Sequence, residues 1–302
     1  MIRAASGIQI PSLSSGQYST IYNLLSLAIA SLGFTALYLV LSRGRVAPRY
    51  RNALLVSATV CGIATYHYFR IFSNFRESYP AGQTVNSSHA LSNIEFNEAY
   101  RYVDWLLTVP LLLVETVAVM ALGKIAQRSL LIKLVPASAL MIGLGYPGEI
   151  ASGTGTRALW GALSTIPFIY LLYVLFVELS RSLVRQPVEV QHTIKMLRLA
   201  LLGLWGVYPI AYLFPIFGGS FFGGSDGFVL RQAGYSLADI FAKAAYGLAI
   251  YKIARVKSML EDVAYVDETV QDADAEATGP TRVGGDQPVP RPGRGSANPV
   301  TG

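Results

Sequence analysis

Lys243 is the residue whose position most clearly suggests chemistry, because it lies in the middle of a long apolar segment, 229–254. An ionisable group in such a segment costs at least a few kcal/mol to bury, so it is a functional candidate. Asp239 lies one helical turn earlier and would neutralise Lys243 as an ion pair. A desolvated lysine amine is also a nucleophile that condenses with an aldehyde, and the resulting protonated imine needs a counterion. The sequence leaves both interpretations open, a structural ion pair and an imine-forming lysine.

A second apolar segment, 97–122, carries Arg101, Asp104 and Glu115. Asp104 and Glu115 are eleven residues apart, which is about 16 Å and about three turns along a helix, so both carboxylates share one face. Thr108 follows Asp104 by four residues and lies near that face. We expect Asp104 and Asp239 to lie at similar depth, where both can serve a charged Lys243.

The segments that carry these residues predict a membrane protein. Of the 302 residues, 52% are hydrophobic and 14% are charged, whereas an ordinary soluble domain has roughly 25% charged residues. Seven apolar segments have about the 20 residues that a bilayer core requires. We therefore expect an all-α membrane protein with seven transmembrane helices, at about 17–42, 50–74, 97–122, 129–147, 156–181, 194–217 and 229–254.

Composition also excludes several kinds of site. Cys61 is the only cysteine, which excludes a disulfide framework and a thiolate metal cluster. The three histidines are widely scattered, so no metal site is expected. The basic residues cluster in short loops between apolar segments, which is a pattern of membrane topology rather than of nucleic-acid binding.

The distribution of lysine and arginine predicts the orientation of the chain. The first, third and fifth loops and the end of the seventh segment are rich in these residues, and the alternate loops are poorer. Because short cytoplasmic loops carry the excess of positive charge, the N-terminus is expected outside and the C-terminus inside. Arg101 and Asp104 then lie toward the outside and Glu115 toward the cytoplasm.

Three regions follow from this organisation. Residues 1–16 are expected to form an extracellular segment, 17–257 the transmembrane domain and 258–302 an acidic cytoplasmic tail. The tail is rich in Gly, Pro, Asp and Arg without an apolar period, which predicts disorder. The polar segment 75–96 is expected to be an extramembrane loop with a short hairpin.

Five motifs, in order along the chain, resemble helices three to seven of the microbial rhodopsins. They are RYVDWLLTVPLLLVE at 101–115, MIGLGYPGE at 141–149, LWGALSTIPF at 159–168, WGVYP at 205–209 and SLADIFAK at 236–243. The resemblance covers about 17–257 and is greatest to the xanthorhodopsin and Gloeobacter rhodopsin group of eubacterial proton pumps. It implies a seven-helix, multi-pass protein of a bacterial inner membrane that works as a pump and not as an enzyme.

The resemblance implies a role for each ionisable residue. Lys243 would bind all-trans retinal covalently as a protonated Schiff base, with Asp104 as counterion and proton acceptor and Asp239 as second counterion. Glu115 would be the cytoplasmic proton donor, and burial should keep it protonated at rest. His67, in the motif TYHYF, would hydrogen-bond Asp104, although a histidine at such a position is otherwise a satisfied core residue. Arg101 would be the cation that supports the carboxylates from the extracellular side.

Further positions are implied to contact the chromophore or to tune it. The retinal pocket would consist of Trp105, Met141, Gly145, Ser164, Thr165, Trp205, Tyr208, Pro209 and Tyr212. Leu112 matches a colour-tuning position, where an apolar residue implies green absorption. Gly161 stands where archaeal pumps have a tryptophan, and in the xanthorhodopsin group this glycine opens the pocket to a carotenoid antenna. The alternative is that Gly161 only eases helix packing.

The residues at 104, 108 and 115 distinguish among the ions that this family transports. Its sodium pumps have Asn, Asp and Gln there, and its chloride pumps lack the acceptor acid. Asp104, Thr108 and Glu115 therefore imply an outward proton pump driven by light. The extracellular group that releases the proton is open, with Glu95, Glu98 and the region of Arg101 as candidates.

Two other functions stay open. A sensory photoreceptor would signal through a partner, although sensors often lack the carboxylate found at Glu115. A retinal-free transporter would use Lys243 and Asp239 as a structural pair. Apart from the lipid bilayer and protons, the partner implied is a second copy of the chain, in a trimer or a pentamer.

Overall fold

The computed structural model describes residues 11–80, 84–85, 88–89, 92, 94, 96–120, 122–151, 153–218 and 222–261. All of them lie within residues 1–265, which pack as one unit. Residues 1–10 of the expected extracellular segment, Glu95, and residues 262–302 of the expected tail lie outside the described residues.

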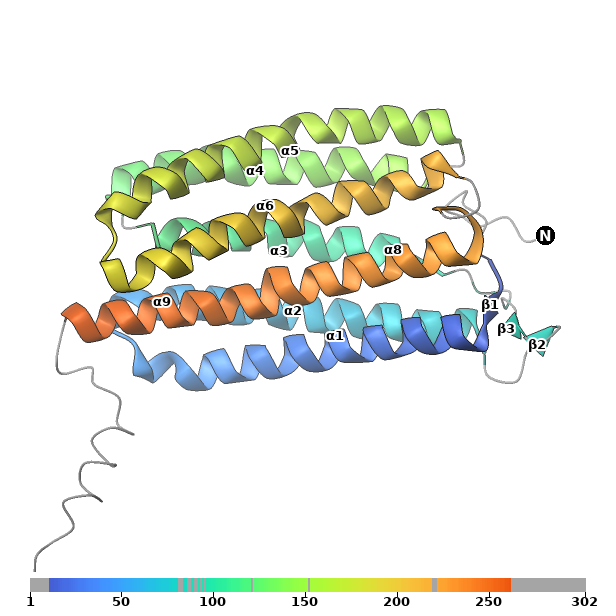
Figure 1. Cartoon of the computed structure of the whole chain (residues 1–302), viewed down its shortest axis with the longest axis horizontal. Helices are drawn as coiled ribbons and strands as arrows, with labels where there is room; N and C mark the ends of the chain where they lie inside the picture. The colour runs from blue at the N-terminus through green and yellow to red at the C-terminus, as the bar shows by residue number, and fades with distance from the viewer. Residues whose placement is uncertain are drawn as a thin grey trace, which may run out of the picture. The chain divides into compact units, whose positions relative to one another are not determined.

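Seven long helices run side by side in the described part of the chain (Figure 1), which confirms the predicted fold class. The seventh is continuous and consists of α8, a π-helical segment η3 and α9; we call these three together helix 7. The helices are α1 (Ser15–Leu41), α2 (Pro48–Ser78), α3 (Ala99–Ala118), α4 (Lys124–Glu149), α5 (Thr154–Ser182), α6 (Val188–Phe217), α8 (Gly224–Asp239), η3 (Ile240–Ala245) and α9 (Tyr246–Glu261). Short 3₁₀ turns follow α1 and α5, η1 (Ser42–Arg45) and η2 (Leu183–Arg185).

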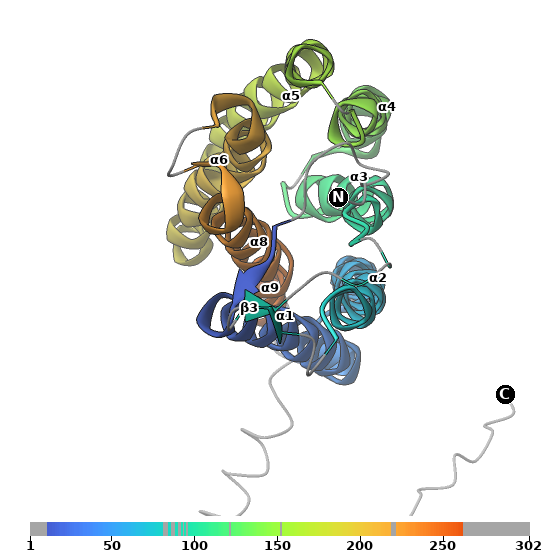
Figure 2. The same cartoon turned by 90° about the vertical axis from the view of Figure 1, so that its right-hand side faces the viewer.

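The helices form a closed ring in chain order. Each packs against the next one, and helix 7 returns to α1. The view along the bundle shows this ring, with α3 and helix 7 facing each other across it (Figure 2). Short connections between antiparallel neighbours produce this order, and the ring brings Asp104 of α3 and Lys243 of helix 7 to the same interior.

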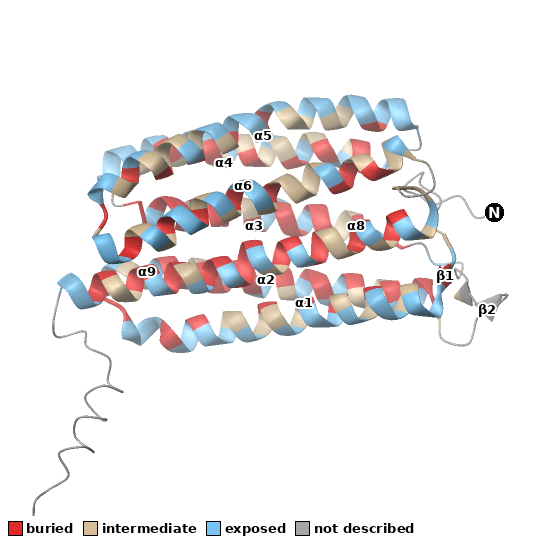
Figure 3. Cartoon of the chain, in the orientation of Figure 1, coloured by how far each residue is buried: buried red, intermediate tan, exposed pale blue. Residues whose placement is uncertain are grey.

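The outer surface is apolar and the interior carries charge, which is the reverse of a soluble protein. Phe34 and Ile166 are 72% and 68% exposed, whereas Arg101 and Lys243 are each 2% exposed. Exposed residues cover the outward faces of the helices (Figure 3). This pattern fits a chain that is embedded in lipid.

Hydropathy alone finds only part of this bundle. Among the described residues, four helices are long and apolar enough to cross a membrane: Ser15–Arg45, Lys124–Glu149, Thr154–Arg185 and Val188–Phe217. The other three, α2, α3 and helix 7, carry His67, Asp104, Glu115, Asp239 and Lys243. Their charged side chains lower the mean hydropathy but lie inside the ring.

A small antiparallel sheet lies before α1 and between α2 and α3. Its strands are β1 (Leu13–Ser14), β2 (Thr84–Val85) and β3 (Ser88–His89), in the order β1-β3-β2. The pair β2–β3 is the hairpin expected in segment 75–96, although α2 runs to Ser78 and so takes the first residues of that segment. Ser14 ends β1 and also caps α1, because it exchanges hydrogen bonds with Gln17 in a capping box.

The cytoplasmic end of helix 7 extends beyond the expected boundary at residue 258. The helix continues to Glu261. Ser258 Oγ accepts a hydrogen bond of 2.8 Å from the backbone N–H of Ala47, and Tyr50 Oη donates one of 2.6 Å to Glu261. These contacts with the start of α2 stabilise the last turn, so the described helix includes four residues, 258–261, that the sequence placed in the tail.

Candidate functional site

Lys243 holds two carboxylates in the centre of the ring. Its Nζ donates to Asp104 Oδ2 at 2.7 Å and to Asp239 Oδ1 at 2.6 Å. All three side chains are buried, and Lys243 lies within the π-helical segment η3. Such segments widen a helix by one residue and are frequent at functional sites. The sequence-predicted triad of one amine and two acids is therefore assembled in the structure.

The two carboxylates differ in their other partners. Asp239 accepts hydrogen bonds from the hydroxyls of Tyr68 at 2.8 Å and Tyr208 at 2.7 Å, and from the indole N–H of Trp105 at 3.3 Å. Asp104 Oδ1 has no hydrogen-bond partner among the described residues. Asp239 is thus held as an anion by several donors, whereas Asp104 keeps one oxygen open.

His67 and Thr108 lie beside Asp104 but do not bond its carboxylate. His67 Nδ1 is 3.8 Å from Asp104 Oδ1, which is too long for a hydrogen bond. The same ring nitrogen lies 3.0 Å from the carbonyl oxygen of Ile63. Thr108 donates to the backbone carbonyl of Asp104 at 2.8 Å. The expected bond between His67 and Asp104 is therefore absent, because the Ile63 carbonyl occupies Nδ1.

Arg101 connects this cluster to the extracellular end of the bundle. Its guanidinium donates to Tyr68 Oη at 2.9 Å and to Gln232 Oε1 at 2.8 Å. Gln232 in turn donates through Nε2 to Glu98 Oε1. A continuous chain of side-chain contacts therefore runs outward from Asp239 through Tyr68, Arg101 and Gln232 to Glu98.

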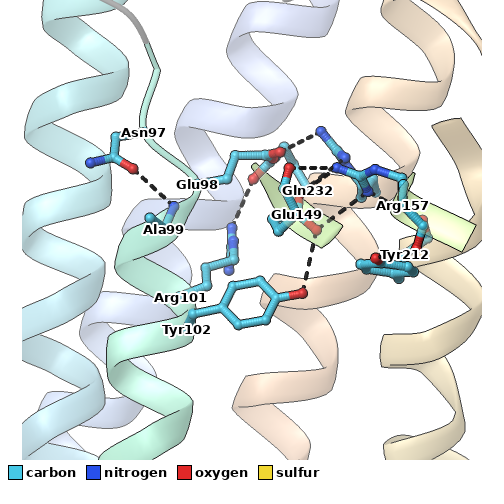
Figure 4. A network of polar contacts seen from close by, with 10 residues as sticks. Asn97, Glu98, Ala99, Arg101, Tyr102, Glu149, Arg157, Tyr212 and Gln232 are labelled. Atoms are coloured by element: carbon cyan, nitrogen blue, oxygen red, sulfur yellow. Dashed lines mark hydrogen bonds and ion pairs between the residues drawn. The ribbon is translucent and has the colours of Figure 1, made fainter. Parts of the chain in front are cut away.

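Glu98 belongs to a buried network with Glu149 and Arg157, which are labelled in Figure 4, and with Arg231. Arg231 lies 2.5 Å from Glu98 and 3.5 Å from Glu149, and Arg157 lies 3.2 Å from Glu149. We call these four residues the extracellular quartet. Its charges balance, and it joins the start of α3, the end of α4 and the start of α5 to the middle of α8. Of these four residues, the sequence indicated only Glu98 as a functional candidate, because single charges near helix ends carry no spacing signal.

On the cytoplasmic side, Glu115 is 1% exposed and bonded to α2. Ser57 Oγ donates to Glu115 Oε2, and Glu115 Oε1 has no hydrogen-bond partner among the described residues. The sequence did not point to Ser57, because a single serine in an apolar helix carries no spacing signal. Glu115 does not reach the Lys243 cluster directly.

An apolar cavity of about 310 Å³ lies against Lys243. Its volume is in the range of pockets for small organic ligands. All of the expected pocket residues line it: Trp105, Met141, Gly145, Ser164, Thr165, Trp205, Tyr208, Pro209 and Tyr212. Leu112, Gly161 and Asp239 line it as well, together with further residues that the sequence did not indicate, such as Tyr102, Phe168 and Tyr235.

Tyr212 fills the space beside Gly161. A Cβ atom added at Gly161 would lie 2.6 Å from Cε1 of Tyr212, and one added at Gly148 would collide with the Tyr212 hydroxyl. The hydroxyl donates to the carbonyl of Arg157 at 2.8 Å, and the Arg157 guanidinium lies 4.9 Å above the ring. Both glycines therefore make room for a tyrosine that forms one wall of the cavity.

Comparison with known proteins places this geometry in a family. A family model described as bacteriorhodopsin-like protein matches residues 18–256. The green-light absorbing proteorhodopsin of a gamma-proteobacterium is 29% identical over 231 residues, 76% of this chain and 84% of that protein. The bacteriorhodopsin of Halobacterium salinarum is 34% identical over 152 residues, 50% of this chain and 55% of that protein.

Solved structures give the same result over most of the chain. Xanthorhodopsin, described as a light-driven ion pump with dual chromophore, is 46% identical with a TM-score of 0.77, and the match covers 84% of this chain and 99% of that chain. Thermophilic rhodopsin is 45% identical with a TM-score of 0.78 over the same shares of the two chains. The ring of seven helices, the buried lysine and these similarities show that the chain belongs to the bacteriorhodopsin-like family, the microbial rhodopsins.

Proposed function

We propose that the chain is a light-driven pump that moves protons out of the cell, with all-trans retinal bound covalently to Nζ of Lys243. The observation that carries the proposal is the unequal bonding of the two carboxylates at Nζ. Asp239 is held as an anion by three donors besides Lys243, and Asp104 keeps Oδ1 open to receive a proton. A proton that leaves Nζ therefore has one prepared acceptor.

The residues around Lys243 fit retinal. The cavity is apolar and bounded by aromatic rings, and it ends at a buried amine with two carboxylates at hydrogen-bond distance. A polyene aldehyde needs this combination, because its chain is apolar and its linkage to the amine carries a charge. When bound, retinal would supply absorption of visible light and a change of shape that reorients Nζ.

The side chains of this protein then define a direction for the proton. Nζ of Lys243 gives its proton to Asp104, and the neutral pair loses its attraction. Glu115, the buried acid on the cytoplasmic side, returns a proton to Nζ and is refilled from the cytoplasm. The proton on Asp104 leaves outward past Arg101. The sum of these steps is one proton taken up from the cytoplasm and one proton released outside.

The xanthorhodopsin neighbour supports a finer proposal, a carotenoid antenna at Gly161, because that protein is described as having a dual chromophore. Gly161 lines the cavity here too, but the Tyr212 ring occupies the space beside it. A carotenoid ring at this position would therefore have to displace or stack on Tyr212. We also propose a bacterial inner membrane as the location and a homo-oligomer, trimer or pentamer, as the assembly, which native mass spectrometry would test.

The pump is tested by the external pH of a weakly buffered suspension of retinal-supplied cells in light and dark. Outward pumping predicts acidification in light that a protonophore abolishes. The matched control is Lys243→Ala, which should give colourless cells without a response. Alkalinisation that a protonophore enhances would indicate that another ion is pumped, and a coloured protein without any pH change would favour a sensory photoreceptor.

A further inference from the structure

The return of a proton from Glu115 to Lys243 has to cross a long distance. Glu115 lies about 16 Å beyond Asp104 along α3, and Asp104 is in direct contact with Nζ of Lys243. A single hydrogen bond spans about 3 Å. Several hydroxyls or water molecules are therefore needed between the two groups, and side chains in this half of the bundle have to hold them in line.

A buried pair of hydroxyls joins α3 to helix 7 next to Glu115. Thr116 directly follows Glu115 on α3, and Tyr246 follows Lys243 by three residues on helix 7. Their hydroxyl oxygens are 2.6 Å apart. Thr116 and Tyr246 are 2% and 5% exposed, and the surrounding core includes Leu112. The pair thus places two hydroxyl groups among the apolar side chains of the core between α3 and helix 7.

The hydrogens of this pair have a defined direction. Thr116 Oγ1 lies 2.6 Å from the carbonyl oxygen of Leu112, to which it donates its single hydrogen. In the contact between the two hydroxyls, Tyr246 is therefore the donor and Thr116 the acceptor. The remaining lone pair of the Tyr246 oxygen is left to accept a hydrogen bond from a water molecule on the path from Glu115.

We propose that Tyr246, held by Thr116, is a positioning residue for the return of the proton from Glu115 to Lys243. Its oxygen anchors the hydrogen-bonded path on the cytoplasmic side of Lys243. The inference rests on the proposed function, because it assumes that Glu115 is the donor. Tyr246 does not line the cavity beside Lys243, so its hydroxyl acts on the path and not on the colour of the protein.

The test uses Tyr246→Phe, which removes one oxygen and keeps the ring. Loss of a hydrogen bond of ordinary strength should slow the return of the proton to Lys243 by about two- to tenfold. Flash spectroscopy measures this rate, and the absorption maximum and the earlier transfer to Asp104 should not change. The matched control is Tyr251→Phe on the same helix, because the Tyr251 hydroxyl is buried without a hydrogen-bond partner among the described residues.

Thr116→Val and the double variant show whether the two residues act as a pair. If they do, Tyr246→Phe adds little to Thr116→Val, whereas independent residues would have multiplicative effects on the rate. The wild type, the two single variants and the double variant are also compared by their thermal unfolding midpoints in the retinal-free protein. There the midpoint of the double variant should again match that of Thr116→Val. A Tyr246→Phe variant with the wild-type rate of proton return would overturn the inference. So would a double variant in which the two effects multiply in the rate and add in the unfolding midpoint.

Glu115→Gln separates this inference from the proposed function. It should slow the return of the proton more than Tyr246→Phe does, since it removes the donor itself. If Glu115→Gln has no effect, the donor assignment fails and this inference with it, whereas the external pH in light still decides whether the chain pumps protons. If Glu115→Gln slows the return and Tyr246→Phe does not, only the role of Tyr246 is wrong.

Discussion

At the scale of single residues, Asp104 and Asp239 share one amine but have different surroundings, and Asp104→Asn tests that difference. An amide cannot accept the proton, so light-driven acidification should stop. Loss of a negative charge beside Nζ destabilises the ground-state positive charge there, so the absorption maximum should shift to the red. Visible spectra and pH recordings measure both effects, with Asp104→Glu as the control that keeps the carboxylate. Undiminished pumping by Asp104→Asn would remove Asp104 as acceptor.

Gly161 gives a second prediction at this scale. Gly161→Ala places a methyl group against the Tyr212 ring, and overpacking of this kind costs about 1–3 kcal/mol. We expect a lower unfolding temperature and a shifted absorption maximum, because Tyr212 is a wall of the cavity. Gly155→Ala is the matched control on the same helix, since no heavy atom lies within 4 Å of the added carbon. Equal effects of the two substitutions would contradict the close packing at Gly161.

The larger Gly161→Trp bears on the antenna. In protein loaded with a carotenoid, it should remove the carotenoid band from the action spectrum of pumping and keep a retinal band, shifted in wavelength as in Gly161→Ala. Pumping itself should continue, because Gly161 touches neither Asp104 nor Glu115. A carotenoid band that persists in the action spectrum would show that no carotenoid transfers energy through this position.

Spacing and motifs were sufficient to predict which residues gather at Lys243, but not their bonds. Asp104, Asp239 and Trp105 meet there as expected. The partner of Glu115 on α2, Ser57, and the Ile63 carbonyl that takes the ring nitrogen of His67 depend on helix rotation and on the backbone. No pattern in one sequence reports either of them.

At the scale of helices, the extracellular quartet should contribute strongly to stability. Arg231→Met leaves the negative charge of Glu98 without its closest cation and removes one of the two arginines that neutralise Glu149. Breaking a buried ion pair lowers the free energy of unfolding by about 3–5 kcal/mol. Arg181→Met is the control, because Arg181 and Glu178 form an exposed pair worth at most about 1 kcal/mol. Unfolding of the two variants in detergent measures the difference. Restoration by Glu98→Gln in the Arg231→Met background would identify the unpaired charge as the cause.

Helix existence was more predictable than helix properties. The seven expected segments all correspond to helices, although hydropathy selects only four of them. The functional charges of α2, α3 and helix 7 lower their hydropathy, so these helices are found only when the charges are interpreted as buried. The π-helical turn around Lys243 and the continuation of α9 to Glu261 depend on contacts between helices, which the chain's own periodicity does not encode.

At the scale of the whole molecule, direction depends on the orientation in the membrane. Asp104 contacts Nζ of Lys243, and Glu115 lies about three turns further along α3, so with Glu115 as donor the proton moves outward only if the Glu115 end faces the cytoplasm. The excess of lysine and arginine in the loops at that end predicts this orientation. The order of the acids along α3 and the distribution of loop charges therefore have to indicate the same orientation. The direction of pumping and the orientation of the chain can be measured separately.

Labelling of introduced cysteines tests the orientation, because the natural Cys61 is fully buried and should not react. Gly44, in the turn after α1, and Gly155, in the first turn of α5, are exposed at opposite ends of the bundle, and a side chain at either position meets no heavy atom within 4 Å. A membrane-impermeant maleimide should label Gly155→Cys in spheroplasts, and Gly44→Cys only after the membrane is broken. The reverse pattern would place Glu115 toward the outside, and light would then have to drive protons inward through the same residues.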